Sequence, residues 1–418
     1  MVIGVHSAKF PTEKITENIR QATARYGLRH AVANDASFRI WKAYGVSAWP
    51  TLVLIDPDGM VVGSAPGEGN YEALDRAIGR LIEAHAGNID AKPRITLTLP
   101  KEEGELLYPG KLAVGGSPPC LYLSDTGHHR ILACDLDGTV RAVYGSGERG
   151  LQDGPGPQAR FHSPQGLCVG KETLYVSDTE NHAIRAVDLK NGIVRTLAGT
   201  GRQARWGARG GKALETALNS PWDVLVHGRA LIIAMAGSHQ IWKLDLDMDE
   251  VKAWIGNGRE NLLDGSAQDC ELAQPSGLAL SGETLFIADS ESSGIRAFDL
   301  KTERLTTLIG TGLFDFGDAE GKGGKTLQHP LAVLPEGGDL IVADTYNHRL
   351  KRLDLKSGKA RFWLGDGKPG TFLEPSGLAL HDGRLYVADT NSHRVLKVDL
   401  ATGKIETLPV GRPARQAP

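Results

Sequence analysis

The sequence predicts a mainly β protein, in which a six-bladed β-propeller follows a smaller, incomplete α/β region. Three observations lead to this prediction. A polar turn motif recurs six times between residues 124 and 395, a proline recurs at a fixed distance before it, and the first 87 residues instead show helical spacing of apolar side chains.

Residues 1–87 are expected to alternate between strands and helices. The expected elements are a strand at 2–6, a helix at 13–27, a short strand at 30–34, a helix at 38–44, a hairpin at 51–64 and a helix at 71–87. The last helix would carry Leu74, Ile78, Leu81 and Ile82 on one face and end at Gly87. Residues 88–107 are interpreted as a linker.

The repeats begin after residue 108. The six turn motifs are SDTGHHRI at 124, SDTENHAI at 177, AMAGSHQI at 234, ADSESSGI at 288, ADTYNHRL at 343 and ADTNSHRV at 388. Fourteen residues before the Asp position of units two to six stands a proline: Pro164, Pro221, Pro275, Pro330 and Pro375. Each unit reads as four short strands, and prolines 45 to 57 residues apart match the period of propeller blades. Residues 108–411 are therefore predicted to form six blades, with 412–418 as a tail.

The sealing of the ring is left open. Residues KIETLPV near the end can supply the fourth strand of the last blade. ITLTL at 95–99 is then either an extra outer strand or part of the linker.

The motifs Asp-Thr-x-Asn-His-Arg and Pro-x-Gly-Leu resemble those of NHL repeats, over about three quarters of the chain. The strings VIGVHSAKFP, SPWDV, IAMAGSHQIW, AQPSGL, ADSESS and LQHPL are further similar to the NHL-repeat-containing protein 2 family. Members of that family join a thioredoxin-like domain to an NHL propeller, and they continue into a further β domain.

This resemblance implies that residues 1–87 are a truncated thioredoxin-like region, entered at its second core strand. Trp49, Pro50 and Thr51 would form its proline loop, and an X-Pro bond is the common place for a cis peptide. The first core strand and the Cys-x-x-Cys helix are missing, so two strand edges should lack partners. The alternative is a fragment of a thiol-disulfide oxidoreductase whose cysteine pair lies upstream of Met1.

Composition narrows the function classes. The net charge of −3 argues against a nucleic-acid binder driven by bulk charge, and no apolar run approaches the roughly 20 residues of a membrane span. The four cysteines, Cys120, Cys134, Cys168 and Cys270, show no metal or redox spacing and suggest free thiols in the cytoplasm. A disulfide between Cys120 and Cys134, across one expected hairpin, is the lesser alternative. No cofactor is expected.

The repeated Asp and His residues are interpreted as structural, because a motif present in every blade answers a need that every blade shares. Turns between second and third strands also lie too far apart to share a zinc ion. These turn residues are Asp125, Asp178, Asp289, Asp344, Asp389, His129, His182, His239, His348 and His393. Met235 and Ser293 depart from the motif, through local drift or because they mark a face specialised for a partner.

The long connections between blades should all emerge on one side, together with these turns. Asp153, Asp264 and Asp318 in them resemble turn residues, with a bound cation as the weaker alternative. One connection places Arg202, Arg205, Arg209 and Lys212 around Trp206, which makes it the candidate partner-binding loop.

The leading hypothesis is a protein-interaction module without catalytic residues. Nucleic acid is the less favoured partner, to be bound through residues 202–212. A propeller lyase or hydrolase with a metal in the channel is the weakest reading, since no single non-repeated cluster of His and Asp supports it.

Overall fold

The computed structural model describes residues 1–67, 69–89 and 104–411, and it divides into unit 1 (Met1–Glu102) and unit 2 (Glu103–Pro418). Unit 2 is the propeller, so the predicted mainly β, six-bladed fold is confirmed. The expected linker and tail, and ITLTL, lie wholly or largely outside the described residues.

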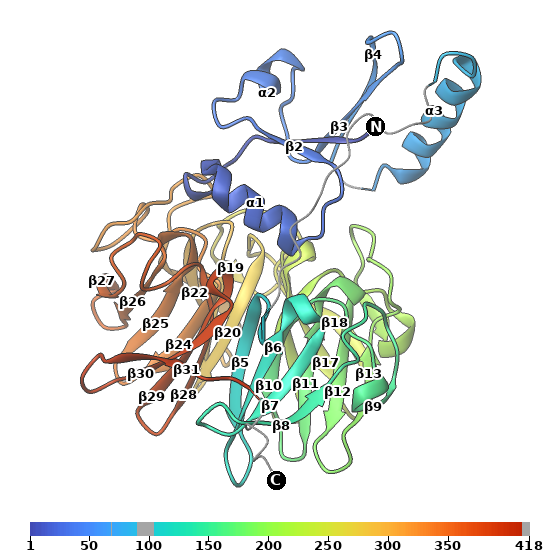
Figure 1. The fold of residues 1–418 in the computed structure, drawn as a ribbon. Helices are drawn as coiled ribbons and strands as arrows, with labels where there is room; N and C mark the ends of the chain where they lie inside the picture. Colours follow the sequence, from blue (N-terminus) through green and yellow to red (C-terminus); the bar gives the residue numbers. More distant parts are fainter. Residues whose placement is uncertain (68, 90–103, 412–418) are drawn as a thin grey trace, which may run out of the picture. The chain divides into compact units, whose positions relative to one another are not determined.

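Unit 2 contains six antiparallel sheets in which each strand pairs with the next along the chain (Figure 1). Blade 1 comprises β5 (Pro109–Gly115), β6 (Cys120–Asp125), β7 (Arg130–Cys134) and β8 (Val140–Tyr144). Blade 2 comprises β10 (Pro164–Val169), β11 (Thr173–Asp178), β12 (Ala183–Asp188) and β13 (Ile193–Ala198). Blade 3 comprises β15 (Pro221–His227), β16 (Ala230–Met235), β17 (Gln240–Asp245) and β18 (Glu250–Ile255).

The remaining blades repeat this arrangement. Blade 4 comprises β20 (Pro275–Ser281), β21 (Thr284–Asp289), β22 (Gly294–Asp299) and β23 (Arg304–Ile309). Blade 5 comprises β24 (Ala332–Glu336), β25 (Asp339–Asp344), β26 (Arg349–Asp354) and β27 (Lys359–Leu364). Blade 6 comprises β28 (Pro375–His381), β29 (Arg384–Asp389), β30 (Arg394–Asp399) and β31 (Ile405–Leu408).

Short elements decorate the blades. The strands β9 (Gly154–Pro155), β14 (Gly210–Lys212) and β19 (Gly265–Ser266) come from the long connections and pair with the outer strands of blades 2, 3 and 4. The 3-10 turns are η2 (Thr126–His128), η3 (Gly156–Gln158), η4 (Thr179–Asn181), η5 (Ala213–Glu215), η6 (Ala236–Ser238), η7 (Thr345–Asn347) and η8 (Thr390–Ser392).

The hydrophobic core of the propeller is divided among the interfaces between neighbouring blades. Six clusters of buried apolar side chains each join two neighbouring blades, and one of them joins blade 6 to blade 1. The innermost strands also contact one another in sequence around a closed ring. The fourth strand of blade 6 is β31, which follows β30 directly in the sequence. The C-terminal segment therefore completes this blade, which is one of the arrangements that the sequence allowed. Val140 of blade 1 further donates its backbone N–H to Gly411 at 2.9 Å.

Unit 1 shows the expected order of elements. They are β1 (Ile3–His6), η1 (Thr12–Lys14), α1 (Thr16–Arg25), β2 (Ala31–Asn34), α2 (Arg39–Ala43), β3 (Thr51–Ile55), β4 (Val61–Pro66) and α3 (Tyr71–Ala84). The short strand at 30–34 is confirmed as β2, which pairs in parallel with β1. The last helix ends at Ala84, three residues before Gly87, because the N–H of His85 makes the final helical bond to Leu81.

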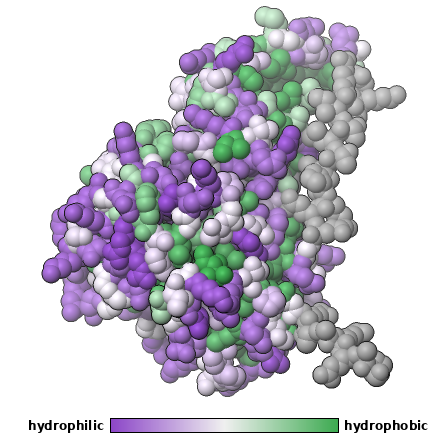
Figure 2. All heavy atoms as spheres, turned by 60° about the vertical axis from the view of Figure 1, so that its left-hand side comes forward, coloured by the Kyte–Doolittle hydropathy of each residue, from purple (hydrophilic) through white to green (hydrophobic). Residues whose placement is uncertain are grey.

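The two sheets of unit 1, β1–β2 and β3–β4, are not joined by any strand of the described residues. The expected apolar face of α3 forms but is not buried, since Ile78 and Ile82 are 43% and 54% exposed. Hydrophobic side chains accordingly gather on the surface of unit 1 (Figure 2). Within the described residues, no helix has both the length and the apolar character needed to span a bilayer.

Candidate functional site

The repeated aspartates hold the chain segment that enters their own blade. Asp125, Asp178, Asp289, Asp344 and Asp389 are fully buried at the end of each second strand. Each accepts, through Oδ1, the backbone N–H of the residue two places before the repeat proline, at 2.5–2.8 Å. These carboxylates are therefore engaged by main-chain donors in a turn.

The repeated histidines tie each turn to the next blade. His129, His182, His239, His348 and His393 adopt left-handed backbone conformations. Each Nδ1 accepts the N–H of the residue just before the next blade's proline, at 3.0–3.3 Å. The bond from Tyr108 to His393 joins blade 1 to blade 6. Ser293 performs the same task in blade 4, where its Oγ accepts the N–H of His329 at 3.3 Å.

Buried cations connect the turns to the long connections. Three fully buried cations lie seven residues after the turn Asp: Arg185, Arg296 and Lys351. Arg185 contacts both Asp178 and Asp153 at 2.8 Å. Arg296 and Lys351 repeat the arrangement with Asp264 and Asp318. The loop aspartates therefore bind a cationic side chain of the propeller itself. Burial raises the pKa of Asp178 to about 6, and the positive charge of Arg185 opposes that rise.

Blade 3 lacks this network. Met235 stands at the Asp position, and its Sδ lies 3.3 Å from the N of Asn219, where the carboxylate would accept. Trp242 fills the cation position and is 1% exposed, with its Nε1 donating to Gln240 at 3.0 Å. An apolar pair thus stands in blade 3 where blades 2, 4 and 5 have the ionic one. Blades 1 and 6 keep an ion pair of another kind, from the partly exposed Arg130 and Arg394 to the turn Asp.

The loop before blade 3 is the candidate partner-binding loop. Trp206 is 87% exposed, and Arg202, Arg205, Arg209 and Lys212 are also exposed. The main chain anchors the loop, since β14 pairs with β18 and the Ala204 N–H donates to Leu218 at 2.8 Å. Lys212 lies 3.5 Å from Glu215, whereas the three arginines have no ion-pair partner among the described residues.

Exposed apolar side chains cluster on the same connections. Nine large apolar residues of the described propeller are exposed, and five lie in the long connections: Leu151, Trp206, Leu214, Leu263 and Phe314. These connections emerge on one side of the ring, because fourth strands end on the side where second strands end. We call this side, formed by residues 145–163, 199–220, 256–274 and 310–329, the loop face.

A buried ion pair crosses the centre of the ring and was not anticipated from sequence. Lys111 of β5 lies 3.9 Å from Asp223 of β15 and also donates to the Leu331 carbonyl before β24. Burial lowers the pKa of Lys111 and raises the pKa of Asp223, and the attraction between them opposes both shifts. The sequence did contain one indication of this pair, which is its position in the repeat. Lys111 and Asp223 both stand where three other blades have the Gly of Pro-x-Gly-Leu.

That glycine position is crowded. A Cβ added at Gly277 or Gly377 would lie 2.5 or 2.3 Å from a carbonyl oxygen of the next blade. The innermost strands therefore leave little room for a side chain at these glycines. Blades 1 and 3 have Lys111 and Asp223 at this position, and blade 5 has the small Ala332.

An open groove of about 660 Å³ lies along β8 of blade 1, lined in part by Arg130, Arg141 and Ser146. Both arginines already have carboxylate partners, Asp125 and Asp135. Its cations are thus engaged within the blade.

In unit 1, the peptide bond between Trp49 and Pro50 is cis and enters β3. The Trp49 indole donates to the Ser7 carbonyl at 2.8 Å and packs against Trp41, with ring centroids 4.6 Å apart. The Thr51 hydroxyl donates to Ala48 at 2.7 Å.

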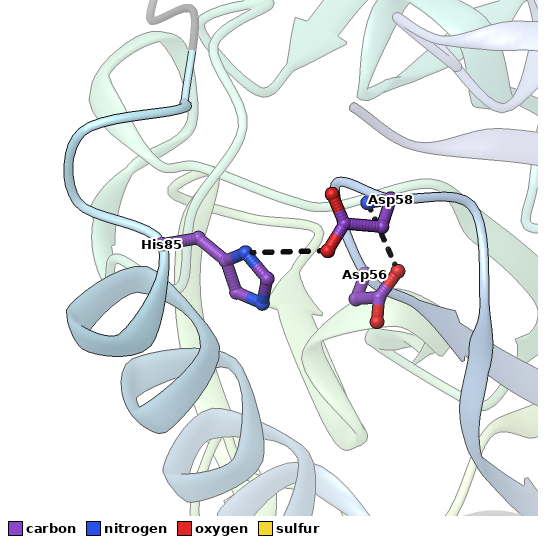
Figure 3. Close-up of side chains that lie close together, drawn as sticks. All are labelled: Asp56, Asp58 and His85. Carbon is purple, nitrogen blue, oxygen red and sulfur yellow. Dashed lines mark hydrogen bonds and ion pairs between the residues drawn. The ribbon is translucent and has the colours of Figure 1, made fainter.

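One group of metal-ligand residues lies close together in unit 1: Asp56, Asp58 and His85 (Figure 3). Asp58 and His85 approach to 4.0 Å. Asp56 accepts the N–H groups of Asp58 and Met60 and so closes the hairpin turn. This turn bonding accounts for Asp56 without an ion.

The described cysteines are all free. Cys120 and Cys134 do not face each other, because Cys134 pairs with Leu121 and therefore lies on the opposite sheet face from Cys120. The alternative prediction of a disulfide is thus wrong, because the strand register places Leu121, and not Cys120, opposite Cys134.

Comparisons with known proteins agree with the repeat assignment. The NHL repeat model matches residues 161–186, 329–353 and 372–398. The chain is 40% identical over 412 residues to Protein SUPPRESSOR OF QUENCHING 1, chloroplastic, of Arabidopsis thaliana, covering 91% of this chain and 39% of that protein. It is 39% and 37% identical to NHL repeat-containing protein 2 of Bos taurus and Homo sapiens, covering 91% of this chain and 59% of each relative.

Proposed function

Because this chain carries NHL repeats and is a homologue of NHL repeat-containing protein 2, we propose that its propeller is a protein-interaction module that uses the loop face. The observation that carries the proposal is the gathering of exposed apolar side chains there, with Trp206 and Phe314 at 87% and 68% exposure. Exposed aromatic residues on a rigid scaffold are the usual anchors of protein interfaces.

The loops are held rigidly enough to serve this role. Asp153, Asp264 and Asp318 fix three of them to buried cations, and backbone pairing fixes the fourth. A preformed surface loses less conformational entropy on binding than a mobile one.

We also propose that residues 1–87 form a thioredoxin-like scaffold joined to this module. The order of elements and the Trp49–Pro50 loop at the start of β3 support it. Since residues 1–119 contain no cysteine, this segment is proposed to contribute structure and surface rather than thiol chemistry.

A reducing compartment such as the cytoplasm is proposed for the propeller. All four thiols are free, and burial raises the pKa of Cys168 and Cys270 to about 11, so these groups remain protonated thiols near neutral pH.

A pull-down with the full chain tests the interaction proposal. Replacing Trp206, Leu263 and Phe314 by serine should abolish capture of partners. The matched control replaces Met248 and Leu355, exposed apolar residues in turns between third and fourth strands on the opposite side of the ring, and should capture as the wild type does. Equal capture by both variants would remove the loop face from the proposal.

A further inference from the structure

The loop before blade 3 differs in charge from the other long connections. Residues 199–219 contain four cations and one carboxylate, for a net charge of +3. The corresponding segments at 145–163, 256–274 and 310–329 carry 0, −3 and −1. Since the whole chain carries −3, the rest of it carries −6, and the positive charge is local to this loop.

The three arginines of this loop make no ion pair with the described part of the chain, and Lys212 pairs only within the loop, with Glu215. In blades 2, 4 and 5 the buried cation is fully matched by a turn Asp and a loop Asp. In blade 3 Met235 and Trp242 replace that pair, and Arg202, Arg205 and Arg209 project from a loop that backbone bonds already anchor. Three guanidinium groups therefore present their donors to solvent.

Exposed apolar side chains are carried by the same loop and by the preceding connection. Leu214 of the same loop is 60% exposed, close in sequence to Trp206 at 87%. Leu151 from the preceding connection lies against Gly201, since a Cβ added there would be 2.8 Å from its Cδ2. This part of the loop face thus carries exposed aromatic and aliphatic groups together with guanidinium groups that have no ion pair within residues 1–67, 69–89 and 104–411.

We propose that this loop binds an acidic protein segment that carries an aromatic or large aliphatic residue. The guanidinium groups of Arg202, Arg205 and Arg209 would pair with its carboxylates, a match that arginine makes in two parallel hydrogen bonds. The apolar residue would pack on Trp206. The inference rests on the proposed interaction function and specifies its partner.

The charge distribution favours a protein segment over nucleic acid. Nucleic-acid binding gains its affinity from the neutralisation of many phosphates along an extended track. Here the positive charge is confined to one loop, on a chain that is otherwise net negative. A segment with two or three carboxylates fits such a surface, whereas a long polyanion would also meet repulsion.

Selection from a random dodecapeptide phage library on the immobilised full chain tests the proposal. The enriched peptides should combine Asp or Glu with an aromatic or large aliphatic residue. The combined substitutions Arg202→Gln, Arg205→Gln and Arg209→Gln should lower the affinity for the selected peptides by roughly tenfold or more. Trp206→Ala should lower it to a similar extent. The control variant, with Arg195→Gln, Arg304→Gln and Lys359→Gln on exposed outer strands, loses the same charge and should bind unchanged.

Each other outcome contradicts the inference in a recognisable way. Enrichment of acidic peptides that bind both triple variants equally would place the acidic site elsewhere. Enrichment of neutral or basic peptides would overturn the acidic assignment but leave the interaction function standing. Tighter binding of a 20-residue oligothymidylate than of any peptide would assign the loop to nucleic acid. Failure to enrich any peptide would contradict both proposals.

Discussion

At the scale of single residues, the propeller uses its carboxylates to satisfy buried donors. Asp178 accepts from the His162 backbone, Asn181 and Arg185, all within 2.8 Å. Taking such a pair out of water is costly, and the pair is retained because each partner compensates the other. Blade 3 shows the alternative, in which Met235 and Trp242 fill the same positions with apolar groups.

This contrast predicts a strongly coupled double-mutant cycle. Arg185→Met leaves Asp178 buried without its cation and should lower the free energy of unfolding by about 3–5 kcal/mol. Asp178→Met leaves the buried guanidinium with Asp153 as its remaining carboxylate partner and should also lower the free energy of unfolding. The double variant should lose less than the sum, because it places apolar side chains at both positions, as Met235 and Trp242 do in blade 3. Urea denaturation provides the measurement, with Arg195→Met on the exposed β13 surface as the control. Additive losses would show that the two side chains act independently.

At the scale of elements, the turn between the second and third strands is also the joint between blades. Its histidine Nδ1 must be unprotonated to accept the N–H before the next proline. Burial lowers the pKa of His348 to about 4, from about 6.5 in an unfolded chain. Between these values the unfolded chain binds a proton that the folded chain does not. The stabilisation that the neutral His348 gives the folded state is therefore complete above pH 6.5 and is lost as the pH falls toward 4.

The variant His348→Ser tests this joint. Serine accepts the equivalent N–H in blade 4, through Ser293, but does not titrate. Between pH 7 and pH 4 the wild type should therefore lose on the order of 3 kcal/mol more of its unfolding free energy than the variant does. An identical pH dependence in urea denaturation of the two proteins would contradict the role given to His348.

The same element shows why so much of the fold could be predicted from sequence. Each blade buries strands of the same length between the same proline and the same turn, so six weak local patterns reinforce one another. The unit 1 elements were likewise predictable in order, because β1 and α3 have clear apolar periodicity. Burial of α3 was not, since periodicity indicates an apolar face but not what covers it.

The central ion pair could not be predicted for a different reason. Lys111 and Asp223 meet only because the ring brings blades 1 and 3 together across the channel, and neither residue has a partner nearby in sequence. The register of Cys120 was missed similarly, because a one-residue shift moves a side chain to the other sheet face. In both cases the outcome depends on geometry beyond the local pattern.

At the scale of the whole molecule, the propeller is a closed ring with two unlike sides. Closure between blades 6 and 1 uses bonds that recur at other junctions. Thr390 donates to the Pro109 carbonyl at 2.8 Å, as Thr126, Thr179 and Thr345 do to the carbonyl of the next blade's proline. Ring closure therefore needs no additional element, and the long connections are not required to close the ring. Blade 3 departs from the motif at the Asp and cation positions, and the loop before it carries both the excess charge and the most exposed aromatic residue of the described propeller.

The central claim, that partners bind on the loop face, is tested most directly by amide hydrogen exchange of the full chain with and without a captured partner. The account predicts added protection in residues 199–219, 256–274 and 310–329, strongest around Trp206. Protection confined to the opposite side, in turns such as 246–249 and 355–358, would contradict it.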